Sequence, residues 1–132
     1  MSGLVLKLSP KERVLVNGAV IENGERRSRL AILTPNVNIL RLRDALRPDE
    51  VTTPVRRVCY VAQLVLSGDV GIEDARKQII TGIEQLSQVF QDPDSRAQLS
   101  QATEAVKAED FYRVLKSLRG LMPREDRLME RM

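Results

Sequence analysis

Apolar and polar residues alternate along the first third of the chain, and this pattern predicts β-strands. Leucine occupies every second position from Leu4 to Leu8. Between residues 13 and 33, three short apolar runs are separated by two Asn-Gly pairs, Asn17-Gly18 and Asn23-Gly24. Asn-Gly favours the tight type I′ turn, because both residues accept positive φ more readily than most. The stretch therefore predicts a three-stranded antiparallel meander with a very short middle strand.

A further strand is predicted over residues 37–43, after Thr34-Pro35-Asn36 breaks the preceding one. Its alternation places one set of side chains on each face. Asn38, Leu40 and Leu42 share one face, and Val37, Ile39, Arg41 and Arg43 share the other. Residues 44–53, which contain Pro48 and several turn-forming residues, read as a connector.

Helical spacing replaces the alternation after about residue 44. Thr53-Pro54 and Asp92-Pro93 each place an N-cap residue before a proline, which is typical of a helix start. The pattern predicts helices over residues 54–66 and 72–90, a third marked by Leu99, Ala102 and Val106, and a fourth marked by Phe111, Leu115, Leu118 and Met122. Ser67-Gly68 ends the first. Pro123 interrupts the fourth, and the tail after it fits either a helix or disorder.

Strands first and helices afterwards predict an α+β fold, with a small N-terminal antiparallel β-sheet followed by a C-terminal bundle of three to four helices. The 132 residues suit a single domain. Within it, residues 4–43 form a β-rich basic part, 54–122 a helical part and 123–132 a tail. We expect the helices to cover one face of the sheet; the alternative is that the sheet pairs with a second copy. The apolar stripe of residues 72–90 predicts a homodimer.

The composition argues against catalysis and against a metal or cofactor. The chain has no histidine and a single cysteine, Cys59, which lies on the apolar face of a predicted helix and is expected in the core. No phosphate-binding glycine loop and no metal-ligand spacing occurs. The N-terminus lacks the apolar segment of a signal peptide, and no apolar run is long enough to span a membrane. These features predict a cytoplasmic protein that is not an enzyme.

Positive charge is concentrated in the first half of the chain. Residues 1–60 carry a net charge of +5 and residues 61–132 a net charge of −2, and nine of the eleven cations in the first half are arginines. Arginine is preferred where a phosphate or a base edge is held in a fixed plane. A solvated surface is the simpler interpretation, and an anionic partner is the functional one.

Six arginines are the candidates for an RNA-binding site: Arg27, Arg29, Arg41, Arg43, Arg56 and Arg57. The first two share one strand face and the next two share another, so four guanidinium groups line one exposed face if the strands are neighbours. The last two lie in the first turn of a helix, whose free N–H groups attract phosphate. Single-stranded RNA fits this pattern, although stacking aromatic residues are scarce. Alternatively, the sheet face is a dimer surface with the arginines at its rim.

Three segments carry a resemblance to a known family. KERVLVNGAVIENGERRSRLAIL, TPVRRVCYVAQLVL and EDFYRVLKSLRGLM resemble the FlbT family of flagellar biosynthesis regulators. The resemblance covers roughly residues 4–122 in order, and NGAVIxNGxRR and TPxRR are its most specific parts.

The resemblance implies a small cytoplasmic bacterial protein that acts after transcription on flagellin. It implies binding to the 5′ untranslated region of flagellin mRNA, with effects on translation and on message stability; some members are repressors and others activators. It also implies work beside FlaF, a small helical protein. The alternative is a protein-interaction module whose helices hold flagellin or a FlaF-like chaperone, with an indirect effect on the mRNA.

Overall fold

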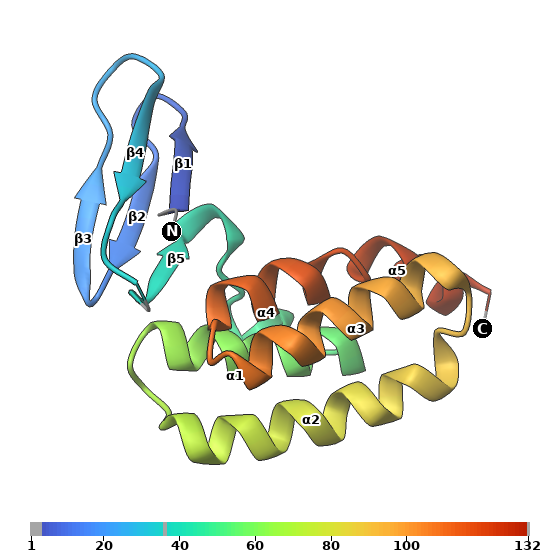
Figure 1. Ribbon diagram of the computed structural model, residues 1–132. Helices are drawn as coiled ribbons and strands as arrows, with labels where there is room; N and C mark the ends of the chain where they lie inside the picture. The colour runs from blue at the N-terminus through green and yellow to red at the C-terminus, as the bar shows by residue number, and fades with distance from the viewer. Residues whose placement is uncertain (1–3, 36, 132) are drawn as a thin grey trace.

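A computed structural model describes residues 4–35 and 37–131, and within them a group of short strands precedes a bundle of helices (Figure 1). The strands are β1 (Leu4–Leu8), β2 (Arg13–Val16), β3 (Ala19–Glu22), β4 (Ser28–Ile32) and β5 (Ile39–Arg41). The helices are α1 (Pro54–Leu66), α2 (Ile72–Val89), α3 (Pro93–Lys107), α4 (Phe111–Arg119) and α5 (Met122–Glu130). The predicted α+β class is confirmed. Asn36, in the predicted break before β5, lies outside the described residues.

The first Asn-Gly pair forms the predicted hairpin turn between β2 and β3. Asn17 has a φ of 46° and Gly18 a φ of 85°, the two positive values that a type I′ turn requires. Val16 and Ala19 are the last partners of the antiparallel ladder on either side of it.

The predicted three-stranded meander is wrong, because β4 pairs with β1 and not with β3. All four residues of β3 are exposed, whereas β1 presents the apolar side of its alternation. Pairing with β1 lets Leu30 and Ile32 of β4 pack against a buried cluster, which β3 does not offer. The second Asn-Gly pair therefore makes no tight hairpin. Asn23 instead ties two loops together: its side-chain amide donates to the carbonyls of Ser9 (2.8 Å) and Arg26 (2.9 Å).

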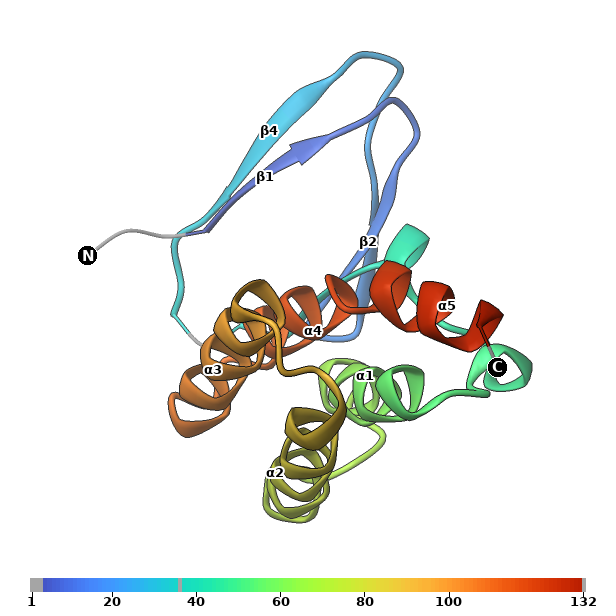
Figure 2. The same cartoon turned by 90° about the vertical axis from the view of Figure 1, so that its right-hand side faces the viewer.

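The strands form two small sheets, β1–β4 and β3–β2–β5, that share a core. Leu6, Leu8, Val14 and Ile39 are buried between them. We call β1 and β4 together the β-arm; Figure 2 shows this pair rising away from the helices.

The helices cover the other face of the β2–β5 sheet, as expected from the sequence. Leu15 and Leu40 face each other across the ladder and pack with the helical core. Tyr112, at the start of α4, contacts both hydrophobic clusters and so joins the β part to the bundle. Strand β5 ends at Arg41, because residues 42–44 turn into a 3₁₀ helix.

The predicted caps set the helix boundaries. The side chain of Thr53 accepts a hydrogen bond from the N–H of Arg56 (3.3 Å), and that of Asp92 accepts one from the N–H of Ser95 (3.1 Å). Gly68 follows α1 with a φ of 83°. The described tail is helical up to Glu130: α4 ends at Arg119, and Pro123 lies in the first turn of α5, where proline is tolerated. The bundle therefore gains one helix beyond the predicted three to four.

Most of the apolar stripe of α2 is buried inside the chain's own bundle. Its buried positions are Ala75, Ile79, Ile83 and Leu86, followed by Phe90 just after the helix. The stripe is therefore explained by packing within one chain and is no longer evidence for a homodimer. The homodimer itself remains a prediction. Cys59 is fully buried on α1, as predicted, and its burial raises the pKa of the thiol to about 12. Across residues 4–35 and 37–131, the structure contains no helix with the length and apolarity to cross a bilayer.

Helices α1 and α2 approach closely at Gly82. A Cβ atom added there would lie 2.5 Å from Cγ2 of Val58, well inside van der Waals contact. Val58 is buried and β-branched, so its side chain has little freedom to move aside.

Gly82→Val is therefore expected to destabilise the protein by about 1–3 kcal/mol, the usual cost of overpacking a core. Urea unfolding followed by circular dichroism measures this change. Gly24→Ala is the control, because no atom lies within 4 Å of the added Cβ and φ is not in the positive region. Equal stability of the two variants would show that the α1–α2 contact is loosely packed.

Candidate nucleic-acid interface

The outward face of the β-arm carries cations. Because side chains alternate along a strand, Lys7 of β1 and Arg29 of β4 point away from the buried leucines. Arg27 lies in the loop just before β4 and is also exposed. None of these three side chains forms an ion pair with a residue in 4–35 or 37–131.

Lys7 and Arg29 are directly opposite each other in the β1–β4 ladder. Like charges at such positions destabilise a sheet. The neighbouring sheet shows the usual arrangement: Arg13 lies opposite Glu22, and their side chains form a 2.9 Å ion pair. The like-charged pair on the β-arm therefore lowers the stability of the sheet, and an anion bound between the two side chains would relieve the repulsion.

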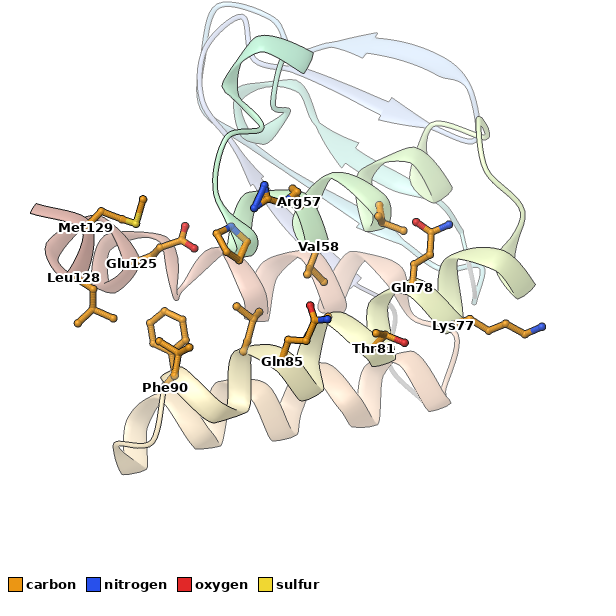
Figure 3. Close-up of a pocket in the computed structure, with 15 residues that line it drawn as sticks. Arg57, Val58, Lys77, Gln78, Thr81, Gln85, Phe90, Glu125, Leu128 and Met129 are labelled. Atoms are coloured by element: carbon orange, nitrogen blue, oxygen red, sulfur yellow. The ribbon is translucent and has the colours of Figure 1, made fainter. Parts of the chain in front are cut away.

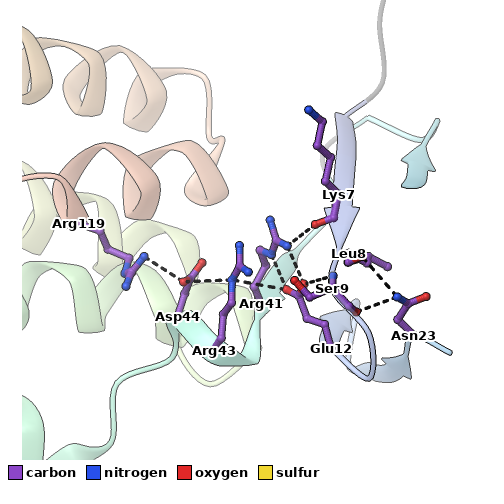
Figure 4. Close-up of polar contacts among 9 residues, drawn as sticks. All are labelled: Lys7, Leu8, Ser9, Glu12, Asn23, Arg41, Arg43, Asp44 and Arg119. Atoms are coloured by element: carbon purple, nitrogen blue, oxygen red, sulfur yellow. Dashed lines mark hydrogen bonds and ion pairs between the residues drawn. The ribbon is translucent and has the colours of Figure 1, made fainter. Parts of the chain in front are cut away.

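Arg41 has a different environment, because it is almost buried in an ion pair with Glu12 (Figure 4). Its Nε donates to Oε2 of Glu12 (2.7 Å), and its Nη2 donates to Oε1 (2.8 Å) and to the carbonyl of Lys7 (2.6 Å). The N–H of Ser9 also donates to Glu12 (3.0 Å). The hydrogen bonds from Arg41 lower the pKa of the Glu12 carboxyl to about 2, and the same bonds raise the pKa of Arg41.

Arg43 lies beside this pair and keeps about half of its side chain exposed (53%). Its Nε is 3.7 Å from Glu12 and 4.0 Å from Asp44, so neither contact is tight. Asp44 accepts a shorter contact from Arg119 of α4 (3.0 Å). A cleft of about 230 Å³ opens here between β5 and α4, and Lys116 also lines it.

We call the cations of the β-arm, of β5 and the turn after it, and of the neighbouring α4 the basic band: Lys7, Arg27, Arg29, Arg41, Arg43, Lys116 and Arg119. Arg29 lies opposite Lys7, Arg41 binds the Lys7 carbonyl, and the cleft connects Arg41 and Arg43 to α4. Two carboxylates, Glu12 and Asp44, lie within the band. The predicted single sheet face with four guanidinium groups is wrong, because β4 and β5 are in different sheets and Glu12 binds Arg41.

Arg56 and Arg57 lie apart from the basic band, at the start of α1. Arg56 contacts Asp126 of α5 (2.9 Å) and Glu125 (3.5 Å). Hydrogen bonding to Asp126 raises the pKa of Arg56 and lowers that of Asp126. The expectation of free N–H groups at this helix end is wrong for Val55, whose N–H donates to the buried Glu125 carboxylate (2.9 Å). Arg57 is exposed and faces a groove between helices.

Three members of the basic band were not among the residues predicted from the sequence. Lys7 was predictable, because the alternation of Leu4, Leu6 and Leu8 already places it on the outer face. Lys116 and Arg119 were not, because only the packing of α4 beside β5 brings them to Arg43.

The fold and this site define a small α+β protein whose exposed cations gather across a β-arm and one neighbouring helix. The family model described as "Flagellar protein FlbT" matches residues 4–129. The chain belongs to this FlbT family, as its three segments suggested.

Relatives of the chain carry names that refer to flagellar repression. The "Flagellum biosynthesis repressor protein FlbT" of Caulobacter vibrioides is 32% identical over 93% of this chain and 86% of its own length. The "Probable flagellum biosynthesis repressor protein FlbT" of Allorhizobium ampelinum is 32% identical over 97% of this chain and 85% of its own length. No solved structure shows a significant match.

The Glu12–Arg41 pair predicts a pH-dependent stability. Because the Glu12 pKa falls from 4.5 to about 2 on folding, the unfolded chain binds the extra proton between these values. The stabilisation is therefore complete above about pH 4.5 and is lost as the pH falls through 2. Glu12→Gln is expected to cost about 2–3 kcal/mol at pH 7, and this difference from the wild type shrinks towards zero near pH 2. Urea unfolding at a series of pH values measures it.

Glu22→Gln is the matched control for Glu12→Gln, because Glu22 pairs with an arginine at an exposed position. It should leave the free energy of unfolding nearly unchanged at every pH. A Glu12→Gln difference that stays constant from pH 7 to pH 2 would contradict the assignment of the low pKa to Glu12.

The like-charged pair on the β-arm predicts a gain in stability on neutralisation. Arg29→Gln removes the repulsion with Lys7 and is expected to raise the melting temperature slightly. Arg13→Gln, which removes an attractive pair with Glu22, is expected to lower it slightly. Calorimetry of the two variants at low salt measures both changes. A loss of stability in Arg29→Gln would show that Arg29 has a structural role.

Proposed function

We propose that this chain is a regulator of flagellum biosynthesis that acts after transcription, by binding the 5′ untranslated region of flagellin mRNA and controlling its translation and stability. The regulatory role is supported by membership of the FlbT family and by the names of the relatives. The identity of the mRNA follows from the resemblance of the three segments to that family. The protein acts in the cytoplasm and performs no catalysis in this proposal.

The observation that carries the proposal is the like-charged Lys7–Arg29 pair on the outer face of the β-arm. A phosphate between these side chains removes their repulsion and forms charge-assisted hydrogen bonds with both. Arg27 extends the same surface at the end of β4. A flexible single strand can follow such a row of cations, since its phosphates contribute most of the affinity.

The six predicted arginines take different parts in this proposal. Arg27, Arg29 and Arg43 keep exposed guanidinium groups in the basic band and contact phosphate. Arg41 mainly holds the strands together through Glu12, and Arg56 mainly holds α1 to α5. Arg57 lies outside the basic band. Bound protein on the leader then blocks ribosome entry or changes access of nucleases to the message.

A protein-interaction module is the second candidate function. In that case the helices bind flagellin or a FlaF-like protein, and the effect on mRNA is indirect. The groove beside Arg57 supports this candidate, because it offers an apolar surface outside the basic band.

Direct RNA binding is tested by a filter-binding titration of the purified protein against a flagellin leader over a salt series. Arg27→Gln/Arg29→Gln is expected to weaken binding and to reduce the slope of log affinity against log salt by about 1.4, about 0.7 for each phosphate that is no longer neutralised. The fold should persist, because both side chains are exposed. Circular dichroism checks this.

The control is Arg13→Gln/Arg47→Gln, which removes the same net charge from two exposed arginines that already have carboxylate partners. It should change leader affinity and salt slope much less. Equal effects of the two double variants would show that RNA binding depends only on the net charge of the protein and not on Arg27 and Arg29. An unchanged slope in Arg27→Gln/Arg29→Gln would exclude these two arginines from the RNA site.

A further inference from the structure

A groove of about 690 Å³ lies between α1, α2 and α5 (Figure 3), and no residue of the basic band lines it. Its apolar lining includes Val58, Val61, Leu86, Phe90, Leu128 and Met129. Val89 at its edge is 62% exposed, and Leu128 and Met129 are 39% and 47% exposed. Single exposed apolar side chains are ordinary on a protein surface, but a contiguous set along a concave surface is typical of a binding site.

The groove has the length of a helix several turns long. Its lining on α2 extends from Lys77 to Val89, which corresponds to about 18 Å at the helical rise of 1.5 Å per residue, and Phe90 continues it just after the helix. Gln78, Thr81 and Gln85 form an uncharged polar rim along this side. An amphipathic helix fits such a groove by placing its apolar face on the floor and its polar face in water.

The charges of the groove identify the chemistry of its occupant. Arg57 on α1 and Lys77 on α2 are its cations, and both are exposed. Across residues 4–35 and 37–131, neither forms an ion pair with another side chain. Glu125 is the one carboxylate among the described lining residues, and its buried side chain is already bound by the Val55 N–H. The accessible charge is therefore positive.

This charge pattern argues against a second copy of the same groove as the occupant. A symmetric contact brings the same patch of both copies together, so Arg57 and Lys77 of one copy would face those of the other. Such a contact places like charges at an interface without any accessible carboxylate to offset them.

We propose that the groove binds an amphipathic helix of another protein, with an apolar face about four turns long and acidic side chains that reach Arg57 and Lys77. The apolar floor supplies most of the affinity, and the two cations select acidic partners and fix the direction of the helix. The site is separate from the proposed RNA surface and shares no residue with it.

Two fluorescein-labelled model helices of about 18 residues test the proposal, each long enough to span the groove. Both carry the same leucine stripe; one has glutamate and the other lysine at the flanking positions. Fluorescence anisotropy with the full chain should show about tenfold tighter binding of the glutamate helix at low salt. Arg57→Glu/Lys77→Glu should reverse this preference. Chemical-shift changes at Val61, Thr81 and Gln85 should map the bound helix to the groove.

A pair of valine variants separates the groove from general surface effects. Val89→Asp should weaken binding of the glutamate helix by about tenfold, because it places a like charge at the apolar edge. Val20→Asp, on β3, should have no effect; the two valines are almost equally exposed, at 62% and 61%. Arg27→Gln/Arg29→Gln should bind the helix as the wild type does, so failure of RNA binding and failure of this proposal are distinguishable.

Three outcomes would overturn the proposal. Equal binding of the two helices, unaffected by Arg57→Glu/Lys77→Glu, would show that the groove does not select an acidic helix. Loss of a dimer in Val89→Asp, seen by light scattering, would make the groove an interface between copies. Competition of leader RNA for the glutamate helix, abolished by Arg57→Glu/Lys77→Glu, would assign the groove to nucleic acid.

Discussion

The position of the β-arm depends on the Glu12–Arg41 ion pair. Glu12 lies in the turn between β1 and β2, and Arg41 ends β5, so the pair joins two segments that are far apart in the chain. The same guanidinium binds the carbonyl of Lys7, which fixes β1 as well. With both partners nearly buried and each oxygen of the carboxylate bonded, the pair meets the conditions under which a desolvated ion pair is tolerated. This contact holds β1, which carries Lys7 and pairs with the β4 strand that carries Arg29.

Seven of the nine arginines in the first half of the chain divide into two groups. Of the other two, Arg26 forms no ion pair with a described residue, and Arg47 has only exposed contacts of 3.4 Å and longer. Arg13, Arg41 and Arg56 have carboxylate partners at 2.7–2.9 Å and act within the structure. Arg27, Arg29 and Arg57 form no ion pair within the described ranges, 4–35 and 37–131, and Arg43 has only long contacts. The net charge of the first half does not show which arginines have a carboxylate partner and which do not. The arginines without a close partner are the ones available to an external anion, and they lie on two separate surfaces.

Local features of the sequence predicted the helices well. The strand order of the sheet was predicted wrongly, because it depends on pairing between segments far apart in the chain. The helix-end signals of Thr53, Asp92 and Gly68 involve only residues a few positions away. The structure therefore shows them at the helix ends that the sequence predicted. The second Asn-Gly pair has the same local signal as the first, yet tertiary packing overrides it. Leu30 and Ile32 gain more by facing the cluster around Leu6 than by pairing with the exposed β3.

The candidate site shows the same limit. Alternation correctly placed Arg29 outwards on its strand, and it also applied to Lys7, which the prediction overlooked. The partners of Arg41 and Arg56 lie 29 and 70 residues away for the closest contacts, so no spacing rule reveals them. The contacts around Arg56 also change which anion binds at the start of α1. A phosphate was expected at the start of α1, and the chain supplies its own anion there, because Glu125 accepts the Val55 N–H.

The two proposed surfaces differ in chemistry and in the elements that carry them, and this separation limits how they influence each other. The basic band uses the β-arm, β5 and α4, whereas the groove uses α1, α2 and α5. A ligand in one site changes affinity at the other only if it binds two conformations of the protein differently. The bundle between the sites is closely packed, and such a core resists gradual deformation. If both proposals hold, a helix bound in the groove is expected to act by adding a second protein beside the RNA and not by changing the shape of the basic band.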